Sequence, residues 1–374
     1  MPTRSDKKNQ SGNGRRRRAA TILDVARRAG VSTATVSRAL TDADRVAAET
    51  RERVMAAIEA TGYSPNATAR NLRIQSTSMV LCLLPGLGHS FWNVIINAVE
   101  EVLTRAKYGV LFGDTRNDPT REAHYDCIVR TGLVDGVLLF NGRLPAADFA
   151  KLDSNFPITL ISNDIPESGL PVIEIANRDA SRQMTEHLIR LGHCRIAHIT
   201  GPEDNIETNE RRRGYMDALA AAGLPINKEL IWPGEFSLAA GANVVGRFLD
   251  LGDQRPTAVF AASDEMAIGF IRAAKEAGLS VPDDVSVAGF DGIEYSAVYD
   301  PRLTTVIQPR TEMGRLGAET LVRRMAGATV ERRRTRLPCT LAFRDSVAPP
   351  REPKPGPNRR RSAKTGAETT MTSL

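Results

Sequence analysis

Apolar positions near the start of the chain recur with the period of an α-helix and are interrupted once, at Gly30. The first helix places four apolar residues on one face: Ile22, Val25, Ala26 and Ala29. Ser32 is suited to cap a second helix, and Val31, Val36 and Leu40 are expected to pack back against the first. Two short helices joined by a glycine-containing turn are the layout of a helix-turn-helix.

The polar positions of the second helix complete this pattern. Thr33, Ala34, Ser37 and Arg38 point away from the small core, where a recognition helix would enter a DNA major groove. A third helix over 48–60 carries apolar residues at helical spacing and completes a three-helix domain. Residues 67–73 have helix-forming composition, but the segment is too short to be a stable helix without a docking surface.

From residue 77 onward, continuous apolar runs alternate with amphipathic segments. Runs typical of strands buried on both faces occupy 79–84, 110–112, 136–140, 158–161, 195–199, 258–261 and 285–288. Helix-length segments occupy 91–107, 120–131, 180–191, 210–222 and 264–278. This alternation predicts parallel sheets covered by helices, with enough strands for two lobes and a cleft between them. Ligands bind such sheets beyond the carboxyl ends of the strands.

Charge is divided unevenly along the 374 residues. Residues 1–78 carry 15 Lys and Arg against 7 Asp and Glu, and residues 349–374 carry 6 against 2, so the segment between them is acidic by 6 charges. A basic N-terminal module on an acidic body fits phosphate-backbone binding confined to one end. The run Arg15–Arg18 fits either that role or a solvated disordered arm.

Several classes of protein are excluded by what the sequence lacks. No apolar run is long enough for a membrane helix, and no signal-type segment opens the chain, so we expect no membrane association and a cytoplasmic protein. Cys82, Cys127, Cys194 and Cys339 form no paired motif and are interpreted as small apolar residues, so no metal site is expected. No phosphate-binding glycine motif and no catalytic set occurs, so we expect neither a cofactor nor an enzyme.

Motifs spread over residues 20–346 resemble the LacI/GalR family of bacterial transcriptional regulators. They are Asp24-Val-Ala, Ala29-Gly-Val-Ser32, Thr35-Val-Ser-Arg38, Thr50-Arg51, Gly62-Tyr-Ser-Pro-Asn66, Val134-Asp-Gly136, His187-Leu-Ile-Arg-Leu-Gly-His193, Ile199-Thr-Gly-Pro202, Arg211-Arg-Arg-Gly-Tyr215, Val281-Pro-Asp-Asp-Val-Ser-Val-Ala-Gly-Phe-Asp291 and Leu303-Thr-Thr-Val306 with Gln308. The motifs are numerous, ordered and correctly spaced.

The resemblance implies an all-α helix-turn-helix headpiece, a hinge helix, and an α/β periplasmic-binding-protein-like body of two parallel-sheet lobes. The implied divisions are the headpiece over 20–65, the hinge over 66–76 and the body over 77–346. Outside the resemblance, composition predicts a disordered basic arm over 1–19 and a disordered tail over 347–374. Within the body, the N-lobe would take about 77–175 and 309–337, and the C-lobe about 176–308 and 338–346.

The same resemblance implies a repressor that binds a near-palindromic operator in double-stranded DNA as a homodimer. The implied DNA contacts are Thr21, Ser32, Thr33, Ala34, Thr35, Ser37, Arg38, Asn66, Ala69 and Leu72. Arg38 could form a bidentate pair with guanine, whereas the short Thr33 and Ala34 offer smaller contacts. Leu72, flanked by arginines, matches a hinge leucine that wedges into the minor groove, although composition alone fits a linker residue.

For the cleft, the resemblance implies a small effector, such as a sugar or sugar derivative. The implied contacts are Phe91, Trp92, Ser162, Arg211, Phe236, Ser263, Asp291 and Gln308. An arginine paired with an aspartate across a cleft suits a ligand rich in hydroxyls. Aromatic faces would stack on a sugar or base ring, while plain core packing is the alternative for Phe91 and Trp92.

Three positions depart from the family pattern and leave the ligand open. Ser162, Ala176 and Ser263 stand where family members often carry Asp, Asp and Asn, so the pocket is expected to differ from a typical hexose site. A constitutive regulator without an effector response is the alternative function. A cytoplasmic small-molecule-binding protein of transport type is a further one, but it would have no use for a headpiece.

Overall fold

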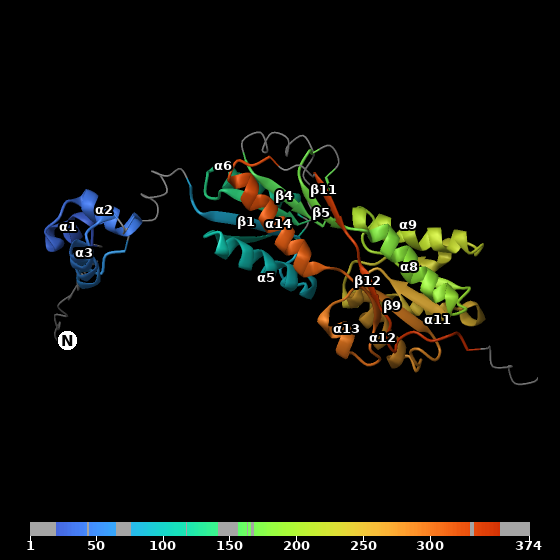
Figure 1. The fold of residues 1–374 in the computed structure, drawn as a ribbon. Coiled ribbons are helices and arrows are strands. Elements are labelled where there is room, and N and C mark those ends of the chain that lie inside the picture. The colour runs from blue at the N-terminus through green and yellow to red at the C-terminus, as the bar shows by residue number, and fades with distance from the viewer. Residues whose placement is uncertain are drawn as a thin grey trace, which may run out of the picture. The chain divides into compact units, whose positions relative to one another are not determined.

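The computed structural model describes residues 20–42, 45–64, 76–116, 118–140, 156–162, 164–165, 168–329 and 333–351. The chain divides into two compact units, residues 1–77 and 78–374 (Figure 1). The predicted basic arm over 1–19 and the hinge residues Asn66, Ala69 and Leu72 lie outside the described residues.

The N-terminal unit is the predicted three-helix domain. Its helices are α1 (Ile22–Ala29), α2 (Thr33–Thr41) and α3 (Ala48–Thr61). Gly30 ends α1 with a φ of 67°, a left-handed conformation that favours glycine, and the Ser32 side chain caps α2 by accepting a bond from the Thr35 N–H. Val25, Val36 and Val54, one from each helix, are fully buried and form the centre of the domain.

The prediction that Leu40 packs in the core of this domain is wrong. Leu40 is 36% exposed, whereas its neighbour Ala39 is buried. The second helix turns its residues 36 and 39 inward, three positions apart, and this leaves Leu40 at the border of the buried face.

The first lobe of the body is built on a six-stranded sheet in the order β11-β5-β4-β3-β1-β2, in which every pairing is parallel. The strands are β1 (Met79–Leu84), β2 (Gly109–Asp114), β3 (Gly136–Phe140), β4 (Ile158–Ile161), β5 (Val172–Ile175) and β11 (Arg334–Leu337). The strands β1, β3 and β4 coincide with continuous apolar runs, as a sheet covered on both faces requires.

The second lobe has its own six-stranded sheet in the order β12-β10-β9-β8-β6-β7. Its strands are β6 (Ile196–Ile199), β7 (Ile231–Trp232), β8 (Ala258–Ala261), β9 (Ser286–Asp291), β10 (Thr304–Ile307) and β12 (Thr340–Ala342). All pairings are parallel except the last, where β12 returns antiparallel to β10 after the chain has crossed from β11.

Helices cover both sheets (Figure 1). Those of the body are α5 (Ser90–Arg105), α6 (Pro119–Arg130), α8 (Asn177–Arg190), α9 (Ile206–Ala221), α10 (Leu238–Asn243), α11 (Val245–Asp250), α12 (Asp264–Glu276), α13 (Glu294–Val298) and α14 (Arg310–Met325), with short 3₁₀ turns over Lys228–Leu230 and Gly252–Gln254. Helix α14 packs with α5 on the first lobe, and α8 packs with α9 on the second. No helix in the described part of the chain is long and apolar enough to cross a membrane.

Two expectations about the body need correction. Strand β2 is an edge strand, and Leu111 and Phe112 are each 41% exposed rather than buried on both faces. The tail is not disordered from residue 347, because the backbone of Ala348 exchanges hydrogen bonds with Ser286 and Arg351 pairs with Asp283 at 2.6 Å. Residues 352–374 lie outside the described ranges.

Candidate functional site

A cavity of about 150 Å³ lies between the two lobes, at the carboxyl ends of their parallel strands. Its lining comes from both lobes and consists of Pro85, His89, Phe91, Trp92, Pro202, Asn205, Glu207, Arg211, Glu235, Phe236, Ser263, Glu265, Asp291 and Ile293. Six of the eight residues expected to contact an effector meet here. Gln308 lies behind the wall and Ser162 lines a neighbouring cavity.

Arg211 is the centre of the polar wall. It is 3% exposed on α9, its Nε donates to Asn177 Oδ1 at 2.8 Å, and its Nη1 donates to the Ala262 carbonyl at 2.6 Å. Nη1 also lies 3.4 Å from Asp291 Oδ1, and the guanidinium packs over the Phe290 ring at 3.8 Å. These contacts fix the arginine in one orientation before any ligand enters.

The sequence led us to expect that the arginine and the aspartate face each other across the cleft, and this expectation is wrong. Both belong to the second lobe, Arg211 on α9 and Asp291 at the end of β9. The pair is therefore a preformed element of one lobe, and closing the cleft would not bring its members together.

Asp291 is held in an environment that favours its neutral form. Burial raises its pKa to about 7, although Arg211 and the Gln308 amide, which donates to Oδ1 at 2.8 Å, oppose this effect. Behind it, burial together with the Asp291 charge raises the pKa of Asp264 well above its usual range. Asp264 in turn accepts hydrogen bonds from the Thr305 hydroxyl and the Ile293 N–H.

The first lobe contributes aromatic surface. Trp92 is 7% exposed and packs edge-on against Phe140 at 5.5 Å and against Phe91 at 4.7 Å between ring centroids. Phe236 of the second lobe completes the apolar side, at a place where Gly201 leaves room for its ring because a Cβ there would collide with it. Trp92 therefore packs in the core of the first lobe and also lines the cavity.

Backbone strain is concentrated at this site. Six of the described non-glycine residues have positive φ, and three of them are expected effector contacts: Ser162 at 87°, Phe236 at 53° and Asp291 at 115°. Such conformations cost energy and persist only where the surrounding structure holds them, so their grouping at one cleft is typical of a binding site.

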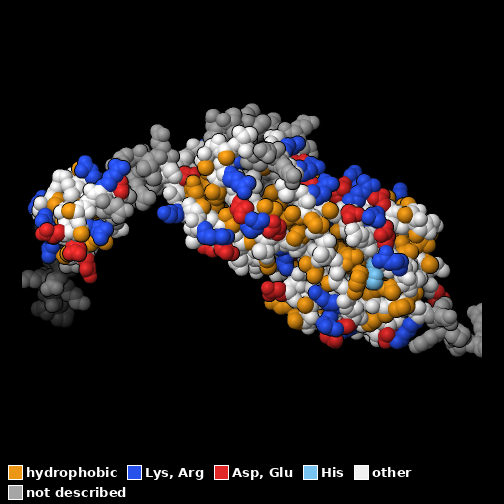
Figure 2. All heavy atoms as spheres, viewed as in Figure 1, with side chains coloured by type: hydrophobic (Ala, Val, Ile, Leu, Met, Phe, Trp, Pro, Cys, Tyr) orange, Lys and Arg blue, Asp and Glu red, His pale blue; other side chains and the backbone are white. Residues whose placement is uncertain are grey.

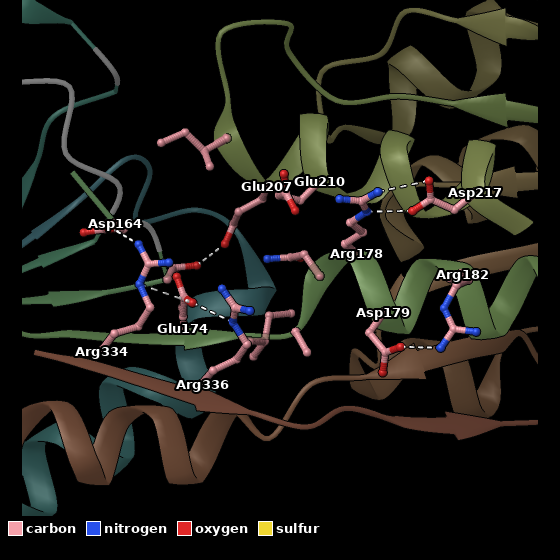
Figure 3. A pocket seen from close by; sticks show the side chains of 15 residues that line it. Asp164, Glu174, Arg178, Asp179, Arg182, Glu207, Glu210, Asp217, Arg334 and Arg336 are labelled. Carbon is pink, nitrogen blue, oxygen red and sulfur yellow. Dashed lines mark hydrogen bonds and ion pairs between the residues drawn. The ribbon is translucent and has the colours of Figure 1, made fainter. Parts of the chain in front are cut away.

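A second, larger cavity of about 620 Å³ adjoins the first, and Glu207 lines both. Figure 3 shows this cavity, where Glu207 extends from α9 toward the first lobe and its carboxylate accepts a hydrogen bond from the Ser162 hydroxyl. The other charged side chains mostly pair within their own lobe: Arg334 with Asp164, Arg336 with Glu174 at 2.8 Å, and Arg178 with Asp217 at 2.6 Å.

Polar contacts join the lobes across the cleft. The Ser162 hydroxyl donates to Glu207, and Glu265 of the second lobe accepts from the Ser90 hydroxyl at 3.4 Å and lies 3.5 Å from His89 Nδ1. Arg310, at the start of α14, donates to the Gly292 carbonyl of the second lobe at 2.7 Å and to the Phe91 carbonyl of its own lobe at 3.4 Å. The cleft is thus bridged at its edges while its centre stays open.

Sequence reasoning missed Glu207, Asn177 and Glu265. A signal for Glu207 was available, because it precedes Arg211 by four residues on one helix and therefore shares its face. Asn177 and Glu265 reach the site only through the packing of α8 and α12, which no local pattern predicts. No group of His, Cys, Asp and Glu in the described residues could hold a metal ion.

The predicted reading surface of α2 is available to a partner. Ser32, Ala34 and Arg38 are exposed, and Thr33, Thr35 and Ser37 are half-buried. The hydroxyls of Ser32 and Thr35 lie 2.9 Å apart within the cap, and Thr21 is tied to Asp24, whose carboxylate accepts its backbone N–H at 2.9 Å. The outward positions form one face, as a helix inserted in a major groove requires.

A helix-turn-helix unit followed by a two-lobed α/β body with a cavity between its sheets defines the class of bacterial transcriptional regulators that pair DNA reading with a ligand-binding domain. Comparison with known proteins agrees. Residues 21–66 match the bacterial regulatory proteins of the lacI family, and residues 185–347 match the periplasmic binding protein-like domain.

Full-length relatives extend this match. The repressor CytR of Escherichia coli (strain K12) is 38% identical over 330 residues, covering 88% of this chain and 96% of CytR. The lac repressor dimer bound to operator and the anti-inducer ONPF is 27% identical with a TM-score of 0.80, covering 88% and 100% of the two chains. The CelR–cellobiose complex is 32% identical with a TM-score of 0.66, covering 87% and 99%.

The chain belongs to the LacI family of bacterial regulatory proteins. It is a DNA-binding transcriptional repressor with a ligand-binding body, and it is not an enzyme.

Proposed function

We propose that this repressor binds a near-palindromic operator as a homodimer, and that a sugar or sugar derivative in the small cavity controls its DNA affinity. The observation that carries the proposal is the preformed polar wall of Arg211 and Asp291, supported from behind by Gln308, which faces the aromatic rings of Phe91 and Trp92. Fixed donors and acceptors opposite flat apolar faces suit a hydroxylated ring. The cellobiose complex of CelR and the operator-bound dimer of the lac repressor support it.

The proposed control is a shift between two arrangements of the lobes. A ligand that touches both walls of the cavity stabilises the arrangement in which the walls are close. The free energy of this stabilisation equals the difference in the ligand's binding free energy between the two arrangements. In a dimer, this would change the separation of the two DNA-reading units and their fit to two half-sites. Loss or gain of DNA affinity on ligand binding is the expected readout.

Operator reading is proposed to use α2 together with the hinge. Ser32, Thr35 and Ser37 would hold phosphates, Thr33, Ala34 and Arg38 would meet base edges, and Thr21, Asn66, Ala69 and Leu72 would contribute the remaining contacts. Leu72→Ala should weaken specific operator binding by a hundredfold or more while nonspecific binding keeps its salt dependence. The matched control is Leu133→Ala, which alters a 56% exposed leucine of the body.

The test uses the full-length protein and an operator selected by that protein from random DNA. Fluorescence anisotropy at fixed salt measures operator affinity with and without a panel of sugars and polyols. A ligand that changes operator affinity at least tenfold would support effector control. Tight operator binding that no ligand alters would favour the constitutive regulator, and equal losses of specific and nonspecific binding in Leu72→Ala would contradict the wedge.

A further inference from the structure

The lining of the small cavity carries an excess of negative charge. Its described carboxyl groups are Glu207, Glu235, Glu265 and Asp291, of which Asp291 has a raised pKa that favours its neutral form, against the guanidinium of Arg211 and the imidazole of His89. Across the visible face of the body, in contrast, acidic and basic side chains are interspersed (Figure 2). A ligand entering this cavity therefore meets mostly acceptors.

The one guanidinium in the wall is already engaged. Arg211 donates to Asn177 and to the Ala262 carbonyl, lies beside Asp291, and covers the Phe290 ring, all with 3% of its surface exposed. A phosphate or carboxylate on the ligand would have to compete with these contacts and face the neighbouring carboxylates. Burying a second negative charge here without a new cation is costly.

Two carboxylates of the lining, the half-buried Glu207 and the exposed Glu235, have no salt bridge among the described residues, and Glu207 lies at the junction of the two cavities. The Glu207 side chain accepts a hydrogen bond from the neutral hydroxyl of Ser162. Figure 3 shows neighbouring Asp164, Glu174, Asp179 and Asp217 each bonded to an arginine, whereas Glu207 reaches across to the first lobe. It stands between the two cavities, where a ligand donor could replace the serine.

The layer directly behind Asp291, outside the cavity lining, is also short of hydrogen-bond donors. The amide nitrogen of Gln308 donates to Asp291, so its Oε1 is left as an acceptor. This atom is buried and has no hydrogen-bond partner among the described residues. A buried acceptor without a donor is costly, so the surroundings of Asp291 offer no spare donor to an acidic ligand.

We propose that the effector presents N–H donors on an amino group, carries no acidic group, and binds Glu207 through that amino group. This inference rests on the proposed effector function and narrows its ligand class. The amino group is either a protonated amine, as on an amino sugar, or a neutral amine on an aromatic ring. The shared chemistry is N–H donation to a carboxylate, and the ring portion would lie against Phe91, Trp92 and Phe236.

The experiment compares ligands that differ at one group, by isothermal titration calorimetry on the full-length protein. Glucosamine is compared with glucose and glucose 6-phosphate, and adenosine with inosine. We expect at least one aminated probe to bind tenfold or more tighter than its counterpart, and glucose 6-phosphate to bind weakest of the sugars. Equal affinity within both pairs, tighter binding of the phosphate, or no binding of either aminated probe would overturn the inference.

Variants assign the preference to one side chain. Glu207→Ala should remove the preference for the aminated probe, whereas Glu203→Ala, which alters an exposed glutamate just before α9, should keep it. Glu207→Gln should keep the preference for a neutral aromatic amine, because the amide oxygen still accepts, but lose it for a protonated amine. An unchanged preference in Glu207→Ala would overturn the role of Glu207. The melting temperature of this variant without ligand checks that the variant folds.

Failure of this inference is distinguishable from failure of the proposed function. A neutral or acidic sugar that changes operator affinity would leave effector control standing and overturn the amine class. An aminated probe that binds the cavity without changing operator affinity would support the ligand class and count against effector control.

Discussion

The two lobes contribute different chemistry to the same cavity. The second lobe supplies the connected polar wall, in which Asn177, Arg211, Asp291 and Gln308 are bonded to one another. The first lobe supplies aromatic surface from Phe91 and Trp92, together with small polar groups at the rim. Polar recognition is therefore built before a ligand arrives, and the first lobe chiefly covers what the second has bound.

This division follows from where each group is anchored. Arg211 and Asp291 project from a helix and a strand end of one lobe, so their geometry does not depend on how the lobes are arranged. Contacts that cross the cleft involve at least one partly exposed side chain: Glu207 beside the buried Ser162, and both partners in the pair of His89 with Glu265. Preorganised groups lose less freedom on binding and so contribute more to affinity.

The largest effect is expected from Arg211→Ala. Removing the guanidinium leaves Asp291 and the amide of Asn177 without their buried partner, which costs about 3–5 kcal/mol for a buried pair. Ligand affinity should fall at least a hundredfold, and the melting temperature should drop. Calorimetry and thermal unfolding measure the two effects.

The control for this variant lies on the same helix. Arg213→Ala removes an arginine whose side chain is 62% exposed and pairs with Glu210, so affinity and stability should stay close to wild type. A tenfold loss or less in Arg211→Ala would show that the second lobe does not dominate recognition.

A smaller effect is expected from the first lobe. Phe91→Ala removes a stacking face worth about 0.5–1.5 kcal/mol, so ligand affinity should fall roughly tenfold. Phe343→Ala, at a 56% exposed residue directly after β12, is the matched control and should leave ligand affinity unaltered. If Phe91→Ala lowered ligand affinity as much as Arg211→Ala does, the two lobes would contribute equally to ligand recognition.

The polar wall should also make stability depend on pH through Asp291. Because burial raises its pKa from 3.8 to about 7, the folded protein holds this proton more tightly than the unfolded chain does. The contribution of this proton to the free energy of unfolding is complete below pH 3.8 and is lost as the pH rises through 7. Asp291→Asn should therefore lose less thermal stability than wild type between pH 4 and pH 8, with a residual slope from Asp264.

Thermal unfolding of both proteins across this range measures the effect. Parallel pH profiles would show that Asp291 is ionised without penalty and that the wall is more open to water than its burial indicates.

The same contrast explains what the sequence could predict. Strands β3 and β4 were predicted at their observed bounds because apolar runs over 136–140 and 158–161 are local signals. Strand β5 was not predicted, because Glu174 interrupts its apolar run. This buried carboxylate is paired with Arg334 and Arg336 on β11, and Arg336 is 162 residues away in the sequence. Local periodicity in the sequence cannot predict a strand whose buried polar group is paired with residues far away in the chain.

The site follows the same rule. Arg211 and Asp291 were assigned through motifs that resemble a family, but the sequence could not place them on one lobe, because that depends on how α9 packs beside β9. Gln308 was expected in the lining and instead supports Asp291 from behind. The hinge contacts of Asn66, Ala69 and Leu72 remain predictions.

The smallest effect is expected from the rim contact between His89 and Glu265, which joins the lobes at 3.5 Å with the His89 side chain 43% exposed. The hydrogen bond with Glu265 raises the pKa of His89 above 6.5, while partial burial opposes this. The stabilisation is thus complete below pH 6.5 and lost as the pH rises through the raised pKa. A double-mutant cycle with His89→Gln and Glu265→Gln should give a coupling of about 0.2–1 kcal/mol at pH 6 and none at pH 8.5. A coupling that persists at pH 8.5, or that matches the loss in Arg211→Ala, would mean that the first lobe holds the second by charge and does not merely cover it.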